Sequence, residues 1–316
     1  MRVVVLAGGY GGAKMAQGFA LLGEEVELSV VGNTADDLQL HGLHISPDLD
    51  TVMYTLAGLA NVDTGWGVRD ETWSAAGMLQ RYGAETWFQL GDRDLATHIR
   101  RTSLLGQGLS LTQVTARLCA ALDVAARLLP MSDDRVATKV RTAQGWLDFQ
   151  DYFVRRQQRD TVLELRFDGV EQARPTADVL RDIDRAEVVI VAPSNPFVSI
   201  GPILALPGLL QRLLDSSAPV LAVSPIVAGA ALRGPAAQML RSLGDGASSV
   251  GVARLYAERY PGLVDLLVVD EADAPESAAI NGAGLTPILG RTVMRNEKDR
   301  GRLAAELLEA VGLRAR

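Results

Sequence analysis

The stretch that decides the fold is LAGGYGGAK, residues 6–14. An apolar run precedes it at residues 3–6, and apolar residues at helical spacing follow it at Met15, Phe19 and Leu22. A buried strand that passes through a glycine-rich turn into a helix is the opening unit of α/β folds that bind nucleotides. The chemistry of this turn therefore indicates what kind of ligand the protein holds.

Neither of the two common glycine-rich templates fits this turn. The Walker template needs Gly before the Lys and Ser or Thr after it, where this chain has Ala13 and Met15. The dinucleotide template G-x-G-x-x-G fits only weakly, with Ala7 in its first place. Lys14 either contacts a bound anion or is solvated on the helix. What remains is an anion cradle of backbone amides at a helix N-terminus, formed by Gly8, Gly9, Tyr10, Gly11 and Gly12.

Short apolar runs alternate with segments of helical period along the chain. Buried parallel strands are expected at 2–6, 26–31, 187–192, 219–223 and 265–269, with helices at 13–22, 203–214 and 235–242. The alternation predicts a single α/β domain over residues 1–316, built on a Rossmann-like, doubly wound and mostly parallel sheet. Residues 70–130 are mostly helical in pattern and predict an inserted cap. Segments 136–142 and 146–154 predict a hairpin, which with a third strand at 162–167 makes a small antiparallel section at 136–168.

The composition excludes several classes of protein. The formal net charge is −7 and the pI is about 5.1, which argue against a nucleic-acid-binding surface. No apolar run approaches the roughly 20 residues of a membrane span, and residue 1 leads directly into the first strand without room for a signal peptide. The single cysteine, Cys119, rules out a disulfide framework. We expect a cytoplasmic protein that binds neither nucleic acid nor membrane.

Polar clusters follow the ends of four predicted strands, the glycine-rich turn being the first. GNTADD (32–37) contains Asn33, Thr34 and Asp36; APSNP (192–196) contains Ser194 and Asn195; VSPIVAG (223–229) contains Ser224. Each cluster alone is an ordinary set of turn formers. Because the carboxyl ends of parallel strands meet at one edge of a sheet, the four together predict a shared ligand crevice.

Aspartates near this crevice are the candidates for a metal site. In PDLDT (47–51), Asp48 and Asp50 can converge on one Mg²⁺ ion, which prefers carboxylates together with phosphate oxygens. Asp36 stands where a carboxylate often reads a ribose hydroxyl. Capping of a helix or turn is the alternative role for these carboxylates. A zinc site is not expected, because His41 and His44 have no third ligand in view.

The polar stretch GDRDLATH (91–98) opens a predicted helix. Arg93 is a candidate phosphate or ligand clamp, and His98 lies about one helical turn further on. The alternative is an exposed helix start stabilised by ion pairs. No covalent serine nucleophile is predicted, because the chain has no G-x-S-x-G elbow and all three histidines precede residue 99.

Eight short strings, taken in order, resemble one family. They are GGxGGAK, NTADD, SPDLDT, LGDRDLATH, PMSDD, FQDYFV, PSNP with SIGPIL, and VSPIV with GPA. Each string alone is weakly specific, but their common order is similar to that of the 2-phospho-L-lactate transferase family, which acts in the biosynthesis of the deazaflavin coenzyme F-420. The resemblance covers residues 1–270, and the end of the chain is less distinctive.

The resemblance implies an Mg²⁺-dependent transfer between two substrates. The deazaflavin precursor Fo (7,8-didemethyl-8-hydroxy-5-deazariboflavin) attacks through its terminal ribityl hydroxyl. Attack falls on the phosphate that carries a small acid in a guanosine diphosphate adduct, GMP leaves, and the phosphodiester of coenzyme F-420-0 or its dehydro form is made. The acid is phospholactate, phosphoenolpyruvate or 3-phosphoglycerate. The family also implies a homodimer.

The resemblance also implies roles for the site residues. It implies that the turn Gly8–Gly12 and the Ser194–Asn195 loop bind the guanosyl substrate. It implies that Asp50 and Arg93 contact Fo. The metal ligands, or a base for the attacking hydroxyl, come from Asp36, Asp48 and Asp50. One departure stands out, because Tyr10 replaces the Thr that the family usually has. Its phenol can hydrogen-bond at longer reach, stack on a ring, or narrow the pocket around the acid.

Two other functions share some of these sequence features. Sugar-nucleotide-binding regulatory proteins, which form a related branch concerned with gluconeogenesis, share the glycine-rich turn and an NTADD-like element. The LGDRDLATH and FQDYFV strings favour the transferase. A nicotinamide dehydrogenase is third, because the dinucleotide template is broken and no catalytic His or Lys–Tyr pair is evident.

Overall fold

The computed structural model describes residues 1–232, 234–244 and 246–314, and its core is a seven-stranded parallel sheet. The strand order is β14-β13-β10-β9-β1-β2-β5, and every neighbouring pair is parallel. The strands are β1 (Arg2–Ala7), β2 (Glu27–Gly32), β5 (Arg127–Pro130), β9 (Val188–Val191), β10 (Val220–Val223), β13 (Leu266–Asp270) and β14 (Thr286–Gly290). The predicted α/β class is confirmed, and all five predicted strands are present.

The sheet is doubly wound, with β1 in its interior. The chain runs from β1 through β2 to β5 in one direction, and later from β9 through β10 and β13 to β14 in the other. The order therefore reverses between β1 and β9, and a ligand crevice is expected at the carboxyl ends of strands at such a point. The glycine-rich turn follows β1 directly and so opens onto this crevice.

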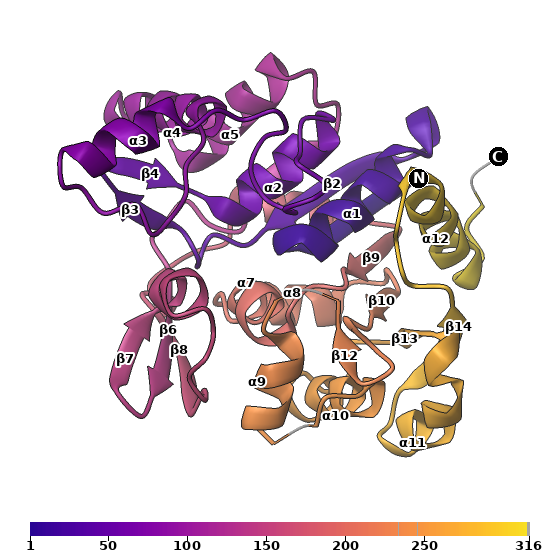
Figure 1. Ribbon diagram of the computed structural model, residues 1–316. Coiled ribbons are helices and arrows are strands. Elements are labelled where there is room, and N and C mark those ends of the chain that lie inside the picture. The colour runs from indigo at the N-terminus through magenta and orange to yellow at the C-terminus, as the bar shows by residue number, and fades with distance from the viewer. Residues whose placement is uncertain (233, 245, 315–316) are drawn as a thin grey trace.

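Helices cover both faces of the sheet (Figure 1). On one face, α1 (Gly9–Ala20), α2 (Pro47–Leu56) and α12 (Glu297–Ala310) pack with Val3 and Val5 of β1. On the other face, Val4 and Leu6 pack with α6 (Ala177–Arg185), α7 (Gly201–Leu204), α8 (Leu209–Asp215), α9 (Ala236–Ser242) and α10 (Ser249–Arg259). Alternate residues of one buried strand thus enter two separate cores, as the geometry of a strand requires.

A helical cap lies beside the β5 edge of the sheet, at the upper left of Figure 1. It contains α3 (Ser74–Arg81), α4 (Asp92–Gly106) and α5 (Leu111–Ala121), and a small hairpin of β3 (Leu38–Leu40) and β4 (Leu43–Ile45) lies under α4. Residues 127–130 form β5 and belong to the main sheet, so the helical segment ends before the predicted residue 130.

The antiparallel section has the strand order β7-β6-β8. Its strands are β6 (Ala137–Thr142), β7 (Gly145–Asp148) and β8 (Glu164–Asp168). The second strand ends at Asp148, earlier than the predicted 154, because the chain turns into the π-helical segment η2 (Asp151–Arg155). This turn stacks Phe149 on Phe153, with ring centroids 5.4 Å apart.

The prediction of one continuous helix at 203–214 is wrong. The segment is two helices, α7 and α8, and Pro207 and Gly208 separate them, Gly208 having a φ of +81°. A proline removes a helical hydrogen bond, and a left-handed residue cannot continue a right-handed helix. Short elements complete the fold: η1 (Gly23–Glu25), η3 (Pro196–Ile200), β11 (Ile226–Val227), β12 (Ala230–Ala231), η4 (Glu271–Glu276) and α11 (Ser277–Gly282).

Among the described residues, no single helix has both the length and the apolar character to cross a membrane. One bent pair of segments, Pro196–Leu204 with Leu209–Asp215, passes that test by length and composition only.

The first turn of α1 approaches the loop after β9 so closely that residue 11 must lack a side chain. A Cβ on Gly11 would lie 2.2 Å from the carbonyl oxygen of Pro193, which is backbone and cannot rotate away. Gly9 adopts a φ of +61°, a conformation that L side chains rarely adopt. The turn is therefore glycine-rich for packing reasons as well as for ligand access.

We predict that Gly11→Ala lowers the free energy of unfolding by about 1–3 kcal/mol, as overpacking in a tight core does. Gly77→Ala is the matched control, since Gly77 lies in α3 and a Cβ there meets open space. That variant is expected to gain up to about 1 kcal/mol from helix propensity. Urea denaturation measures both. Equal stabilities for Gly11→Ala and the wild type would contradict the packing argument.

Candidate functional site

A cavity of about 720 Å³ lies at the predicted crevice. It is lined by the first turn of α1, the start of α2, the loops after β9 and β10, and residues 292 and 294 before α12. The cap contributes Trp66, Trp87 and Phe88, and the antiparallel section contributes Phe149 and Phe153. One end of the cavity is thus lined by backbone amides and short polar side chains, and another part by aromatic rings.

Most residues predicted from sequence meet in this cavity. Those that line it are Gly8, Gly9, Tyr10, Gly11, Lys14, Asp36, Asp48, Asp50, His98, Ser194, Asn195 and Ser224. Gly12, Asn33 and Thr34 are buried behind the lining. Arg93 is the exception, because its side chain is exposed and its Nη1 donates to the carbonyl oxygen of Arg69 at 3.2 Å. The interpretation of Arg93 as a ligand clamp is therefore not supported by its position.

The amides of the glycine-rich turn are partly occupied by side chains of the protein. The Gly8 amide donates to Ser194 Oγ at 3.2 Å, and that hydroxyl donates to the Gly8 carbonyl oxygen at 2.8 Å. The Gly9 amide donates to Asp48 Oδ1 at 2.8 Å. The first amides of a helix have no partner within the helix. The Gly11 amide, in the same first turn and in the cavity lining, is therefore a donor that an anionic ligand would meet.

Asp48 and Asp36 are two buried carboxyl groups that repel each other. Burial raises the pKa of Asp48 to about 6, while hydrogen bonds from Asn33 and from the Gly9 amide act to lower it. Burial, followed by repulsion from Asp48, raises the pKa of Asp36 well above its usual value. Asp36 Oδ1 is buried and has no hydrogen-bond partner among the described residues. The hydrogen bonds given for this pair come from neutral donors, so no positively charged side chain in these contacts neutralises the two carboxyl groups. Their oxygens could therefore serve as ligands for a cation.

Asp50 belongs to a different network, which is built on one face of α4. Arg101 is 1% exposed and grips the Asp50 carboxylate with both terminal nitrogens, Nη1 lying 3.0 Å from Oδ2 and Nη2 contacting Oδ1. His98 Nδ1 lies 3.2 Å from Arg101 Nη1, so Nδ1 accepts and the ring proton is assigned to Nε2. Two-point pairing of this kind fixes the orientation of a carboxylate as well as its charge.

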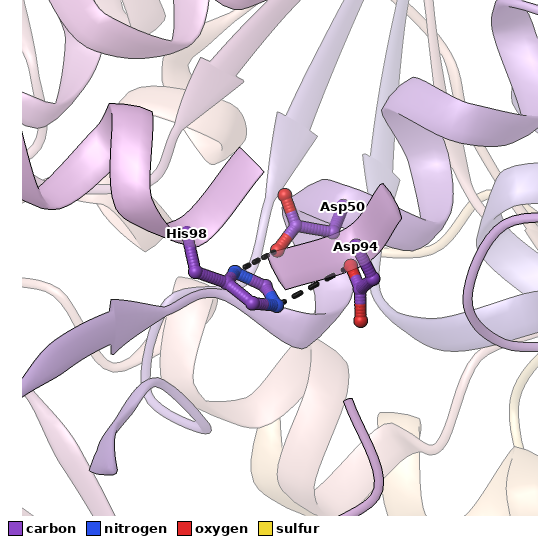
Figure 2. A group of neighbouring side chains, drawn as sticks. All are labelled: Asp50, Asp94 and His98. Carbon is purple, nitrogen blue, oxygen red and sulfur yellow. Dashed lines mark ion pairs between the residues drawn. The ribbon is translucent and has the colours of Figure 1, made fainter. Parts of the chain in front are cut away.

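Figure 2 shows that His98 lies between two carboxylates. Its Nδ1 is 3.7 Å from Asp50 Oδ2, and its Nε2 is 3.3 Å from Asp94 Oδ1. The Tyr54 hydroxyl donates to the same Asp94 oxygen at 2.8 Å. Asp50, Asp94 and His98 present three ligand atoms within 4.8 Å of one another. The guanidinium of Arg101 already neutralises Asp50, so a cation here would have to displace a buried arginine.

The predicted convergence of Asp48 and Asp50 on one metal ion is not what the structure shows. The two residues are two positions apart on α2, and residues at that spacing do not face each other on a helix. Asp48 turns toward the α1 N-terminus and Asn33, and Asp50 turns toward Arg101. Asp36, rather than Asp50, is the electrostatic neighbour of Asp48.

Sequence reasoning missed Arg101, Asp94 and Tyr54. The signal was present, because Asp94, His98 and Arg101 follow one another at intervals of four and three residues and so share one helical face. Arg93 attracted attention because it lies inside the conspicuous polar string, yet the period of the helix points it to solvent. Asp92 from the same string instead caps α3, accepting from the amides of Ser74 and Ala75.

We predict that Asp48 makes folding pH-dependent between about pH 4 and pH 6. The folded protein keeps its Asp48 proton up to a pKa of about 6, whereas the unfolded chain releases it near 3.8. Stability therefore falls as the pH rises through this window, by an amount on the order of 3 kcal/mol.

Asp48→Asn cannot titrate and is the comparison for this effect. Urea denaturation at pH 4, 5, 6 and 7, without added divalent cation, is expected to show the wild type losing stability relative to the variant as the pH rises. Parallel pH profiles for the two proteins would contradict the assignment.

Comparisons with known proteins agree with this geometry. The model of the family described as 2-phospho-L-lactate transferase CofD matches residues 3–289. A phosphoenolpyruvate transferase of Kitasatospora aureofaciens is 46% identical over 291 residues, with 90% of each chain covered. Phosphoenolpyruvate transferases of Streptomyces griseus and Mycolicibacterium smegmatis are 44% and 42% identical over 290 residues, covering 90% and 86% of this chain and 90% and 89% of theirs.

Solved structures show the same fold at low identity. A Bacillus halodurans protein of the UPF0052 family superposes in two crystal structures with TM-scores of 0.66 and 0.63, at 16% and 13% identity. The matches cover 97% of this chain and 99% and 98% of the other. The family match over nearly the whole chain, with relatives above 40% identity, shows that this chain belongs to the 2-phospho-L-lactate transferase family.

Proposed function

We propose that this protein transfers phosphoenolpyruvate from its guanosine diphosphate adduct to Fo, releasing GMP and forming dehydro coenzyme F-420-0. The observation that carries the proposal is the cavity, which joins an amide cradle, two unneutralised carboxyl groups and an aromatic wall. Phosphoryl transfer depends on positioning and charge neutralisation more than on a covalent nucleophile. Relatives named phosphoenolpyruvate transferases support this acid over phospholactate and 3-phosphoglycerate.

In the proposed reaction, the terminal ribityl oxygen of Fo forms a bond to the phosphorus that carries the acid. The bond from that phosphorus to the bridging oxygen of the diphosphate breaks, and GMP leaves with this oxygen. The hydroxyl proton is lost to the surroundings of the site. The product is a phosphodiester that joins Fo to the acid.

The donor lies at the glycine-rich end of the cavity in this proposal. The Gly11 amide, in the first turn of α1, faces the diphosphate, as helix N-termini do in many phosphate sites. Asn195 and Ser224 complete this wall, and both are held in place by local bonds. Asn195 Oδ1 accepts from the Phe197 amide at 2.9 Å, and Ser224 Oγ lies 3.0 Å from Ser249 Oγ. Rigid loops of this kind position a substrate without paying for their own ordering.

Fo lies between the cap and the antiparallel section, against the aromatic wall. Trp87 and Phe88 come from the cap, and Phe149 and Phe153 come from the other side. The flat ring system of a deazaflavin stacks well on such side chains. Asp50 faces the same part of the cavity and accepts a hydrogen bond from the ribityl chain. Arg101 pairs with the Asp50 carboxylate through both terminal nitrogens and orients it as a hydrogen-bond acceptor.

The residues present fit the Mg²⁺ ion that the family resemblance implies. Asp36 and Asp48 would hold it, since both have raised pKa values and Asp36 Oδ1 lacks a hydrogen-bond partner. Bound there, Mg²⁺ would supply charge neutralisation for the diphosphate. The chain's own contribution is to keep two carboxylates close together in a buried place, at a cost in stability that the ion would relieve.

The reaction is tested with purified protein, Fo, Mg²⁺ and each of the three guanylylated acids. GMP release and product mass are followed, and the phosphoenolpyruvate adduct is expected to give the highest kcat/KM. No GMP release with any of the three would overturn the proposal. Tight sugar-nucleotide binding without turnover would favour the regulatory alternative. The homodimer that the resemblance implies stays a prediction, which light scattering on the same preparation checks.

We predict that Asp50→Asn lowers kcat/KM by at least about 100-fold, because a neutral amide cannot replace an oriented anion at the acceptor. Arg101→Lys is expected to lower it as well, since lysine keeps the charge but not the two-point grip. Asp123→Asn, on an exposed residue outside the cavity, is the matched control. Near-normal turnover of Asp50→Asn would remove this residue from the reaction.

A further inference from the structure

Tyr10 joins the glycine-rich turn to a part of the cap far away in sequence. It is the second residue of α1 and lines the cavity. Its hydroxyl donates to the carbonyl oxygen of Val62 at 3.3 Å. The same side chain thus borders the first turn of α1 and is bonded to a segment whose residues 64–67 also line the cavity.

Val62 belongs to a compact turn at residues 61–67. Asn61 Oδ1 accepts from the amides of Asp63 and Thr64, at 3.0 and 3.3 Å, and the Gly65 amide donates to the Asn61 carbonyl oxygen at 2.9 Å. The turn carries Trp66, which lines the cavity. Its ring packs edge-to-face against that of Trp73, with the two ring centroids 6.4 Å apart. Backbone bonds hold the base of the turn, including the Ala60–Val68 bridge and the bond from the Arg69 amide to the Leu59 carbonyl oxygen. The bond from Tyr10 reaches its outer part, at Val62.

Lys14 fixes the phenol ring from the next turn of the helix. Its Nζ lies 4.4 Å from the centroid of the Tyr10 ring and donates to the Met294 carbonyl oxygen at 2.8 Å. The contact of a cation with the face of a ring restrains the ring as well as attracting it. Tyr10, Lys14 and Met294 therefore line one side of the cavity together, next to the amide proposed to bind the donor.

We propose that Tyr10 determines which phosphorylated acid the cavity accepts. Its ring limits the space beside the first-turn amides, and its hydroxyl holds the turn at 61–67 closed over that space. Resting on the proposed function, this favours an acid whose carboxylate is on the carbon that bears the phosphate oxygen, as in phosphoenolpyruvate and phospholactate. It disfavours the longer 3-phosphoglycerate, whose carboxylate is one carbon further from the phosphate. The ring and the hydroxyl have separable effects.

The first experiment tests the hydroxyl without any substrate. Tyr10→Phe keeps the ring and removes the bond to Val62, so amide hydrogen exchange at residues 61–67 is expected to become roughly 5- to 10-fold faster. Tyr82→Phe is the matched control, because Tyr82 is 78% exposed and outside the cavity lining. Unchanged exchange across the turn in Tyr10→Phe would overturn the role of the hydroxyl.

The second experiment tests the ring by donor binding with Fo omitted. Calorimetry gives Kd for the guanosine diphosphate adducts of phosphoenolpyruvate and 3-phosphoglycerate. Tyr10→Ala is expected to shift their Kd ratio about tenfold toward 3-phosphoglycerate, a typical effect of pocket size, while Tyr10→Phe keeps the wild-type ratio. Thermal unfolding of each variant confirms that it is folded.

The outcomes of these experiments are distinct from those of the turnover assay. A Kd ratio that stays within a factor of about 2 in Tyr10→Ala would overturn the specificity role, even if the wild type turns over normally. Donor binding with the expected shift but no GMP release would overturn the proposed reaction and leave the role of Tyr10 in acid recognition standing.

Discussion

The hydrogen bonds of one carboxyl group, that of Asp48, join the parts of the site to one another. Asp48 lies in the first turn of α2, accepts from the Gly9 amide of α1, and accepts from the side chain of Asn33 after β2. Asn33 in turn donates to the Val198 carbonyl oxygen after β9. Three strand ends are thereby connected through a few buried atoms. This connection and the close approach of Gly11 to Pro193 hold the glycine-rich turn in its observed position.

Asp50 differs from the pair Asp36 and Asp48 in how its negative charge is balanced. This difference is the basis of the separate roles proposed for them. Asp50 is matched by a buried arginine, so its charge is already compensated within the protein. Asp36 and Asp48 have raised pKa values and only neutral donors as hydrogen-bond partners. A cation gains most where the negative charge is least compensated. In the proposed reaction, Asp48 and Asp50 of one helix therefore have different partners, a metal ion and an organic substrate.

The sequence predicted the sheet well because its central strands are unbroken apolar runs. The edge strands were missed: β5 has four residues and ends in Pro130, and β14 contains Pro287, which is tolerated at an edge. At the site, residues at strand ends were found, since those ends converge in any doubly wound sheet. Arg101 was not found, because its role depends on which face of α4 is buried and not on a recognisable sequence motif. The pairing of Asp48 with Asp36 instead of Asp50 likewise needed the direction in which each side chain leaves the backbone.

The packing of α12 against α1 bears on the order in which the parts of the pocket assemble. Lys14 donates to a carbonyl oxygen 280 positions later, and a Cβ on Gly18 would lie 2.4 Å from the Arg300 carbonyl oxygen. Contacts between segments so far apart in sequence close a long loop, and the entropy cost of that closure slows their formation. We therefore expect the wall of the pocket that contains Lys14 and Met294 to form late in folding, after the neighbouring contacts of α1 with α2.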